Sequence, residues 1–171
     1  ALTGHLVFST LHTNDAPSSI IRLVDIGIKP FMVSSGVRAI NAQRLVRTIC
    51  TTCKEPYTPD ALELRRLGFD VDLENTEFMH GAGCDNCHGS GYTGRMGIHE
   101  LLTMTDAMRA MILAQESTVV LRREARHDGM ITLRQDAYQK ALNGITTIEE
   151  VNRRTKPDEP LKARDKSLQT A

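Results

Sequence analysis

Net charge is what this sequence most plainly lacks. Its 171 residues carry 21 Lys and Arg against 21 Asp and Glu, so the formal net charge is zero. A dedicated nucleic-acid-binding protein has a marked basic excess, and we therefore expect no direct nucleic-acid partner.

Long apolar runs are missing as well. No stretch approaches the roughly 18 residues of a membrane-spanning helix. The first residues, "ALTGHLVFSTLH", have neither the basic flank nor the small-residue cleavage site of a secretory signal peptide. We therefore expect a cytoplasmic protein. Because stable disulfides persist mainly in oxidising compartments, we expect its cysteines to be reduced.

The first recognisable pattern predicts an α/β fold. Residues 5–11, "HLVFSTL", are almost continuously apolar, as in a parallel strand covered on both faces. A helix follows, with Asn14 or Asp15 as its N-cap and Gly27 as its stop. A strand that leads into a capped helix is half of a βαβ unit. Since "ALTG" reads as the last turn of a helix, we expect part of a larger domain before residue 1.

The rest of the chain divides by composition. We expect a helix over 31–38, a strand over 41–49, and a short helix in "DALELRRLG". Four short helices follow in a small bundle, capped by Asp106, Thr118, Thr132 and Thr147, the last two opening capping boxes with Gln135 and Glu150. The final residues have almost no large apolar side chain, so we expect disorder there. The expected segments are a core portion (1–49), an insert (50–95), a helical subdomain (96–155) and a tail (156–171).

The insert contains the most specific chemical pattern, C-x2-C-x30-C-x2-C, formed by Cys50, Cys53, Cys84 and Cys87. Two C-x2-C turns can supply four thiolates to one zinc ion, and four protein ligands leave no open position for water. The sequence therefore predicts a structural Zn²⁺ site without catalysis. The gap exceeds the roughly 15–20 residues of common zinc ribbons. Doubling a loop costs only about 0.6 kcal/mol, far below the roughly 10 kcal/mol of metal binding.

Other interpretations of these cysteines stay open. They could form two disulfides or be four incidental thiols. His88 could replace one cysteine as a ligand, and His80 is nearby, although with four thiolates present we expect both to face solvent. A thioredoxin-like redox site would need a C-x2-C at a helix N-terminus, a pattern that neither pair shows.

Four motifs occur in the order expected of one family: "TGHLVFSTLHTNDA" (3–16), "AQRLVRTIC" (42–50), "CTTCKEPY" (50–57) and "GYTGRMGIHELL" (91–102). From residue 1 to about 155 the chain resembles the C-terminal part of the bacterial ATPases that drive type II secretion and type IV pilus assembly. The resemblance implies the last part of a RecA-like core, a tetracysteine zinc insert and a C-terminal helical region. It also implies a hexameric ring, peripheral to the inner membrane, that works with inner-membrane platform proteins.

The departures from this family pattern matter for activity. The sequence has no G-x4-G-K-[ST] phosphate loop and no hydrophobic strand ending in acidic magnesium ligands. In the family both precede the histidine-containing motif. We therefore expect ATP and Mg²⁺ to bind only in a full-length parent, and this chain alone to be inactive.

The resemblance also suggests nucleotide-contacting residues. It makes His12, with Thr10 and Thr13, the candidate contact to the γ-phosphate, because ligands of open α/β sheets lie beyond the carboxyl ends of strands. His5 would lie about 23 Å away along an unbroken strand and is expected to be structural. Arg95 lies where the family places an arginine near the nucleotide. A surface histidine and a solvated arginine are the simpler alternatives.

Two further points stay open at this stage. Arg44 and Arg47 could serve subunit contacts, or they could simply form the polar face of a strand. "CDNCHGSG" also matches the C-x2-C-x-G-x-G element of Hsp40-type co-chaperones. A free-standing zinc-binding adaptor or chaperone-like module without ATPase activity is therefore the alternative function.

Overall fold

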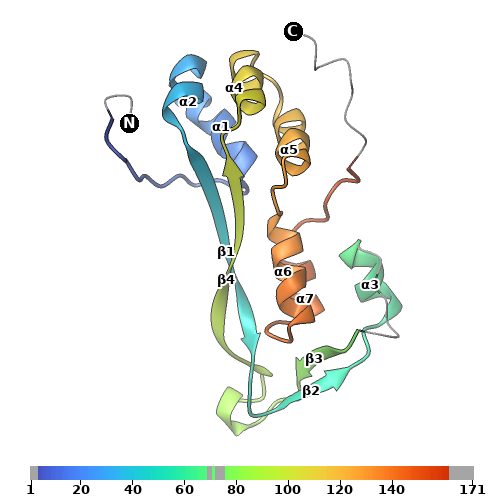
Figure 1. The fold of residues 1–171 in the computed structure, drawn as a ribbon. Coiled ribbons are helices and arrows are strands. Elements are labelled where there is room, and N and C mark those ends of the chain that lie inside the picture. The colour runs from blue at the N-terminus through green and yellow to red at the C-terminus, as the bar shows by residue number, and fades with distance from the viewer. Residues whose placement is uncertain (1–3, 69–70, 72–75, 162–171) are drawn as a thin grey trace. The chain divides into compact units, whose positions relative to one another are not determined.

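The computed structural model describes residues 4–68, 71 and 76–161, and both helices and strands are present (Figure 1). The elements are α1 (Ala16–Asp25), α2 (Pro30–Gly36), β1 (Ala39–Ile49), β2 (Lys54–Tyr57), α3 (Ala61–Leu67), β3 (Phe78–Gly81), a 3₁₀ turn (Asp85–Cys87), β4 (Tyr92–Thr103), α4 (Asp106–Leu113), α5 (Thr118–His127), α6 (Leu133–Leu142) and α7 (Ile148–Arg154). The mixed α/β composition is confirmed. None of the helices in the described part is both long and apolar enough to cross a bilayer.

The strands form two small sheets. β1 pairs with β4, and β2 pairs antiparallel with β3 with Lys54 opposite Gly81. The arrows of β1 and β4 run in opposite directions in Figure 1. The predicted strand over 41–49 is therefore confirmed as the greater part of β1.

The predicted strand over residues 5–11 is wrong for the chain as described. These residues have no regular secondary structure, and Leu6, Val7 and Phe8 are 78%, 61% and 88% exposed. A strand covered on both faces needs neighbouring strands for its hydrogen bonds and helices over its side chains. Within the described ranges no segment pairs with residues 5–11, so the apolar run lies open.

Two compact units divide the chain, and they cut across the expected segments. Unit 1 combines the residues up to Ala42 with Glu100–Ile131 and the residues from Glu159 on, whereas unit 2 combines Gln43–His99 with Thr132–Asp158. β1 and β4 therefore contribute to both units. Of the four C-terminal helices, α4 and α5 belong to unit 1 and α6 and α7 to unit 2.

Unit 1 has a continuous apolar core. Ile20 of α1, Val33 of α2, Leu102 of β4, Met108 of α4 and Leu121 of α5 are each at most 1% exposed and lie in one cluster. Burying such a side chain stabilises a fold by about 1.5–3 kcal/mol. These contacts hold the helices of unit 1 on the end of β4.

Helix caps explain where most helices begin. Asp15 accepts a hydrogen bond from Ser18 N and caps α1, and Thr132 forms the predicted capping box with Gln135. Thr147 caps α7 through Glu150 N, as expected. For α4 and α5 the caps are Thr105 and Ser117, one residue before those predicted, because a cap lies outside the helical residues.

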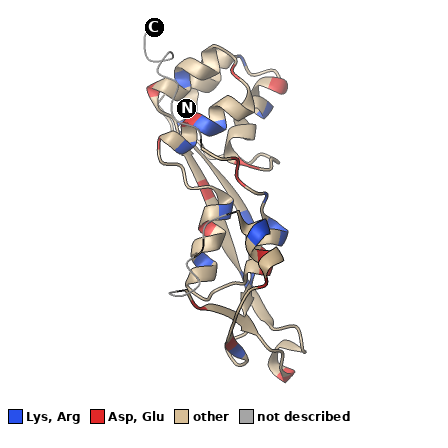
Figure 2. Cartoon of the chain, turned by 90° about the vertical axis from the view of Figure 1, so that its right-hand side faces the viewer, with Lys and Arg blue, Asp and Glu red and all other residues tan. Residues whose placement is uncertain are grey.

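The first residues of the expected tail make contacts. Residues 156–161 contain no helix or strand, yet Thr132 Oγ1 donates to Asp158 Oδ2 at 2.7 Å and Arg126 donates to Glu159 O. The remainder, 162–171, lies outside the described residues. Basic and acidic side chains are interspersed along the elements (Figure 2).

Unit 2 is organised around a buried arginine. Arg134 of α6 is 2% exposed, and its guanidinium donates to Leu67 O at 2.9 Å and to Arg66 O, both at the C-terminal end of α3. It also donates to Asn152 Oδ1 at 2.7 Å and to Thr155 Oγ1 at 2.9 Å, at the end of α7. The last carbonyl groups of a helix have no partner within the helix. One side chain thus satisfies acceptors at two helix ends.

Replacing this arginine should destabilise the fold. We expect Arg134→Leu to lower the free energy of unfolding by about 3 kcal/mol, because several buried acceptors would lose their donor. Urea unfolding followed by circular dichroism measures the change. Arg65→Leu, at an exposed position of α3, is the matched control and should stay within about 0.5 kcal/mol of wild type. Equal losses in both variants would contradict the role given to Arg134.

Candidate functional site

The two cysteine pairs lie at strand ends. Cys50 follows β1 directly and Cys53 precedes β2, while Cys84 precedes the 3₁₀ turn between β3 and β4 and Cys87 is the last residue of that turn. The pairing of β2 with β3 puts residues 53 and 82 side by side, where Ala82 N donates to Cys53 O at 2.9 Å. The 30 intervening residues are thus closed at their base by a small sheet, which explains how so long a gap is spanned.

The four sulfur atoms converge on one point. The Sγ atoms of the four cysteines all lie within 4.8 Å of one another. The Cys50–Cys84, Cys53–Cys87 and Cys84–Cys87 sulfurs are 3.9, 3.8 and 3.8 Å apart. A tetrahedral ion with metal–sulfur bonds of about 2.3 Å separates its sulfurs by about 3.8 Å. The cluster is therefore positioned to hold a metal ion, and its sulfurs are not paired in disulfides.

Hydrogen bonds to sulfur support this interpretation. Gly83 N donates to Cys53 Sγ at 3.3 Å, and Cys84 N and Gly91 N both donate to Cys87 Sγ at 3.2 Å. Asn86 Nδ2 lies 3.5 Å from Cys50 Sγ. Donors aimed at sulfur stabilise the thiolate, which is the form that binds metal. Backbone amides in and beside the second cysteine turn therefore favour the thiolate forms of Cys53 and Cys87.

The thiols do not ionise alike without a cation. Hydrogen bonds from Thr93 and Asn86 lower the pKa of Cys50 to about 5, whereas burial raises the pKa of Cys53 to about 12. Neighbouring negative charges oppose one another, so four thiolates at this spacing need a compensating positive ion. The donor set is all sulfur, which suits zinc.

Two glycines allow the turns to close. Gly81, at the end of β3, and Gly91, before β4, face each other so closely that a Cβ on either would overlap the backbone of the other. Gly91 also has a φ of 75° and accepts a hydrogen bond from Cys50 N at 2.9 Å. Only glycine combines that backbone conformation with that approach at no steric cost.

Neither histidine near the cysteines joins the sulfur cluster. His80 Nε2 lies 3.1 Å from Glu55 Oε1, and its ring lies 5.1 Å from that of Tyr57. His88 is exposed and adopts a left-handed conformation with φ of 52°. Both were expected to face solvent, which holds for His88, whereas the His80 side chain is 39% exposed and contacts Glu55.

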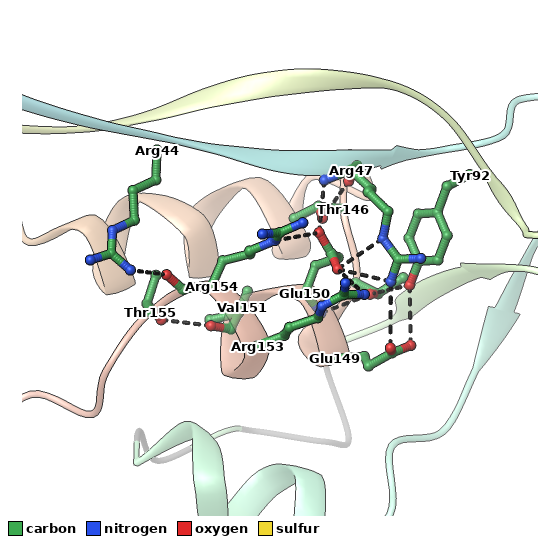
Figure 3. A network of polar contacts seen from close by, with 11 residues as sticks. Arg44, Arg47, Tyr92, Thr146, Glu149, Glu150, Val151, Arg153, Arg154 and Thr155 are labelled. Atoms are coloured by element: carbon green, nitrogen blue, oxygen red, sulfur yellow. Dashed lines mark hydrogen bonds and ion pairs between the residues drawn. The ribbon is translucent and has the colours of Figure 1, made fainter. Parts of the chain in front are cut away.

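A buried carboxylate next to the cysteine region gathers several arginines (Figure 3). Glu150 of α7 is 0% exposed. Its Oε2 accepts from Arg47 N and its Oε1 from Arg47 Nε, both at 2.9 Å. Arg153 and Arg154 place guanidinium nitrogens 3.5 and 3.6 Å from the same carboxylate. The Arg47 guanidinium in turn stacks 3.8 Å from the centre of the Tyr92 ring.

The charge state of Glu150 follows from this environment. Burial by itself raises the pKa of its carboxyl, but the two hydrogen bonds from Arg47 and the charges of Arg47 and Arg154 outweigh burial. The net effect is a pKa below the usual range. Glu150 is therefore ionised at neutral pH and holds Arg47 against Tyr92, two residues of the strands that flank the cysteine turns.

The same arginines line a cavity. It has a volume of about 590 Å³ and is bordered by Gln43, Arg44, Leu45, Arg47, Arg95, Arg153 and Arg154. Arg44 Nη1 is held by Arg154 O at 2.9 Å, while Arg95 is exposed on β4. Guanidinium groups bind phosphate and carboxylate groups well. The cavity can therefore accept an anionic group, and Arg95, predicted from the sequence, is one of its walls.

The other predicted nucleotide contacts lie in unit 1. His12 and Thr10 are exposed before α1, and Thr13 Oγ1 lies 2.6 Å from Ser19 Oγ. His12 thus lies in the irregular segment before the capped helix α1. It belongs to unit 1, whereas Arg95 belongs to unit 2.

Sequence reasoning missed the central role of Glu150. Its position three residues after Thr147 suggested a capping box, and Thr147 does cap α7. The carboxylate instead bonds Arg47, 103 residues away in the sequence. The sequence signal of this network was the presence of Arg44 and Arg47 among the apolar residues of a predicted strand. That signal did not identify the acid.

Comparisons with known proteins agree with the motifs. The model of a family described as "Type II/IV secretion system protein" matches residues 1–153. The chain is 48% identical over 156 residues to the type IV pilus assembly ATPase PilB of Thermus thermophilus, which covers 91% of this chain and 18% of that protein. It is 48% identical over 159 residues to type II secretion system protein E of Pseudomonas aeruginosa, covering 92% and 31%.

A third relative extends this picture. The type II secretion system ATPase E of Vibrio cholerae is 44% identical over 156 residues, covering 91% of this chain and 31% of that protein. The chain thus spans less than a third of the length of these three relatives. The resemblance deduced from the four sequence motifs is confirmed.

The Glu150 network makes stability depend on pH. Because the pKa of Glu150 is lowered in the fold, its contribution is complete above the ordinary glutamate pKa of roughly 4.3 and is lost as pH falls through the lower folded value. We expect Glu150→Gln to reduce the free energy of unfolding by about 2 kcal/mol at pH 7, and by less at acid pH. Denaturant unfolding of both proteins at pH 7 and at acid pH measures the difference between their free energies of unfolding.

Glu149→Gln is the matched control for that experiment. The Glu149 side chain is 61% exposed and lies 3.5 Å from Arg47, so its loss should change stability by about 0.5 kcal/mol or less. A Glu150→Gln effect that does not shrink as pH falls would contradict the assignment of Glu150 as a low-pKa carboxylate.

Proposed function

Since the chain belongs to the type II/IV secretion system protein family, we propose that it is the C-terminal part of an ATPase that powers type II protein secretion or type IV pilus assembly. The observation that carries the proposal is the match of more than nine-tenths of the chain to proteins named for these functions. Two features support the proposal. The sulfur cluster could hold a stabilising metal ion, and the arginine-lined cavity could accept an anionic group such as a phosphate.

The sulfur cluster in this proposal is a structural zinc site. Cys50, Cys53, Cys84 and Cys87 would fill all four positions of a tetrahedral ion, so no position is left for water or substrate. The metal would fix the two cysteine turns at the ends of β1 and β4. It would thereby stabilise the strands that carry Arg47 and Arg95.

The proposed nucleotide contacts are those that the family resemblance suggests. His12, with Thr10 and Thr13, would contact the γ-phosphate of ATP, and Arg95 would place a guanidinium near a phosphate. ATP and Mg²⁺ would be held mainly by a phosphate loop and acidic residues outside this sequence, so the chain alone would not hydrolyse ATP. The exposed residues 6–8 would then pair with strands of a RecA-like core.

The proposed segments and assembly are those that the family resemblance implies. Residues 1–49 would be the distal part of the RecA-like core, 50–95 the zinc insert and 96–155 the C-terminal helical region. The full-length protein would form a hexameric ring in the cytoplasm, peripheral to the inner membrane, and would act on platform proteins there.

The zinc proposal is tested by metal analysis. We expect the purified chain to carry about one equivalent of zinc, and its thiols to react with a thiol reagent only as zinc is displaced. Cys84→Ser should lose most of the metal, whereas Ser90→Ala, which leaves every ligand in place, should retain it. Less than half an equivalent of zinc with freely titrating thiols would refute the site.

The ATPase proposal is tested at the gene and in its full-length product. We expect a phosphate loop within about 150 residues, one domain length, upstream of Ala1. In the full-length protein, Arg95→Gln should lower the kcat for ATP hydrolysis about tenfold or more, because a charge near phosphate would be lost. Arg65→Gln, on α3, should leave kcat unchanged. Absence of a phosphate loop would overturn the ATPase proposal.

A further inference from the structure

The turn between His12 and α1 is held by side chains from two distant elements of unit 1. Glu100 lies on β4 and Arg122 on α5, and they contact Ala16 and Asp15, four and three residues after His12. These contacts join parts of the sequence 84 and 107 residues apart. No feature of the cysteine cluster or of the arginine-lined cavity requires them.

Glu100 makes the more deeply buried of these contacts. Its residue is 4% exposed, and its Oε1 accepts a hydrogen bond from Ala16 N, the first residue of α1, at 2.8 Å. The first amide groups of a helix lack partners within the helix and attract negative charge. Ala16 and Ile20 are buried beneath the same turn. A buried carboxylate therefore ties the start of α1 to β4.

Arg122 fixes the other side of the turn. Its Nη2 donates to Asp15 Oδ2 at 2.8 Å, while Asp15 Oδ1 accepts from Ser18 N at 2.9 Å. Asp15 thus caps α1 and pairs with α5 at once. Thr13 Oγ1 lies 2.6 Å from Ser19 Oγ, which ties the residue next to His12 onto α1. The backbone just after His12 is thereby held from β4, from α5 and from α1 itself.

We propose that Glu100 and Arg122 are positioning residues, which fix the His12 turn so that its imidazole can meet a nucleotide phosphate. This inference rests on the phosphate contact proposed for His12. Small displacements of a phosphate-contacting group are costly to catalysis, so a turn held from several sides is better suited to the task than a free one.

Nuclear magnetic resonance of the 171-residue chain tests the positioning itself. In Glu100→Ala we expect amide hydrogen exchange at Ala16 to accelerate about tenfold or more, and the His12 imidazole resonances to shift. Glu100→Gln keeps an acceptor oxygen and should stay within about threefold of wild type. Glu116→Ala, at a partly exposed position after α4, is the control. Exchange at Met108, in the core, reports whether a variant is loosened globally.

Arg122 supplies an independent test if Glu100→Ala fails to fold. Arg122→Gln should loosen Asn14 and Asp15 and shift the His12 resonances, whereas Arg123→Gln, the next residue of the same helix, should not. Unchanged exchange at Ala16 in folded Glu100→Ala would overturn the inference. Unchanged His12 resonances in both Glu100→Ala and Arg122→Gln would do the same.

Steady-state kinetics of the full-length protein separate this inference from the proposed function. If both hold, His12→Ala and Glu100→Ala each lower kcat about tenfold or more, and Glu100→Gln restores it to within about threefold. A normal kcat in His12→Ala would refute the phosphate contact, and with it the purpose given to the two positioning residues. A low kcat in His12→Ala with a normal one in folded Glu100→Ala would refute the positioning role alone.

Discussion

The convergence of four sulfurs is the constraint on which the cysteine-containing unit depends. Pairing of β2 with β3 closes the long segment between the two C-x2-C turns, and the contact between Gly81 and Gly91 brings the turns together. Backbone amides then point at the sulfurs of Cys53 and Cys87. Bringing four potential thiolates this close is unfavourable without a cation, so the arrangement makes physical sense as a metal-binding centre.

The strands that leave this centre carry the charged groups of unit 2. Arg47 on β1 and Tyr92 on β4 lie three residues before Cys50 and five after Cys87, and they stack on each other beside the buried carboxylate of Glu150. A buried carboxylate is tolerated only when donors surround it, and Arg47 supplies two. β1 and β4 run from the cysteine turns to the arginine-lined cavity. The conformation of the turns therefore bears on the shape of the cavity.

Unit 1 also contains a buried carboxylate that joins a helix to a strand distant in sequence. There the buried carboxylate is that of Glu100, and its donor is the first amide of α1. In each unit a helix and a strand distant in sequence are joined by one buried acid rather than by apolar packing alone. Buried hydrogen-bonded charges hold one geometry more strictly than interchangeable methyl groups do.

The local elements could be derived from the sequence, since they depend on neighbouring residues. Asp15, Thr132 and Thr147 cap helices as predicted, β1 follows its alternating pattern, and the cysteine spacing identified the cluster. Only the tertiary structure decided that residues 5–11 are not a strand here, because strand formation requires a pairing partner. It likewise decided which acids meet Arg47 and Arg122, 103 and 107 residues away, because periodicity and capping carry no information about contacts at such separations.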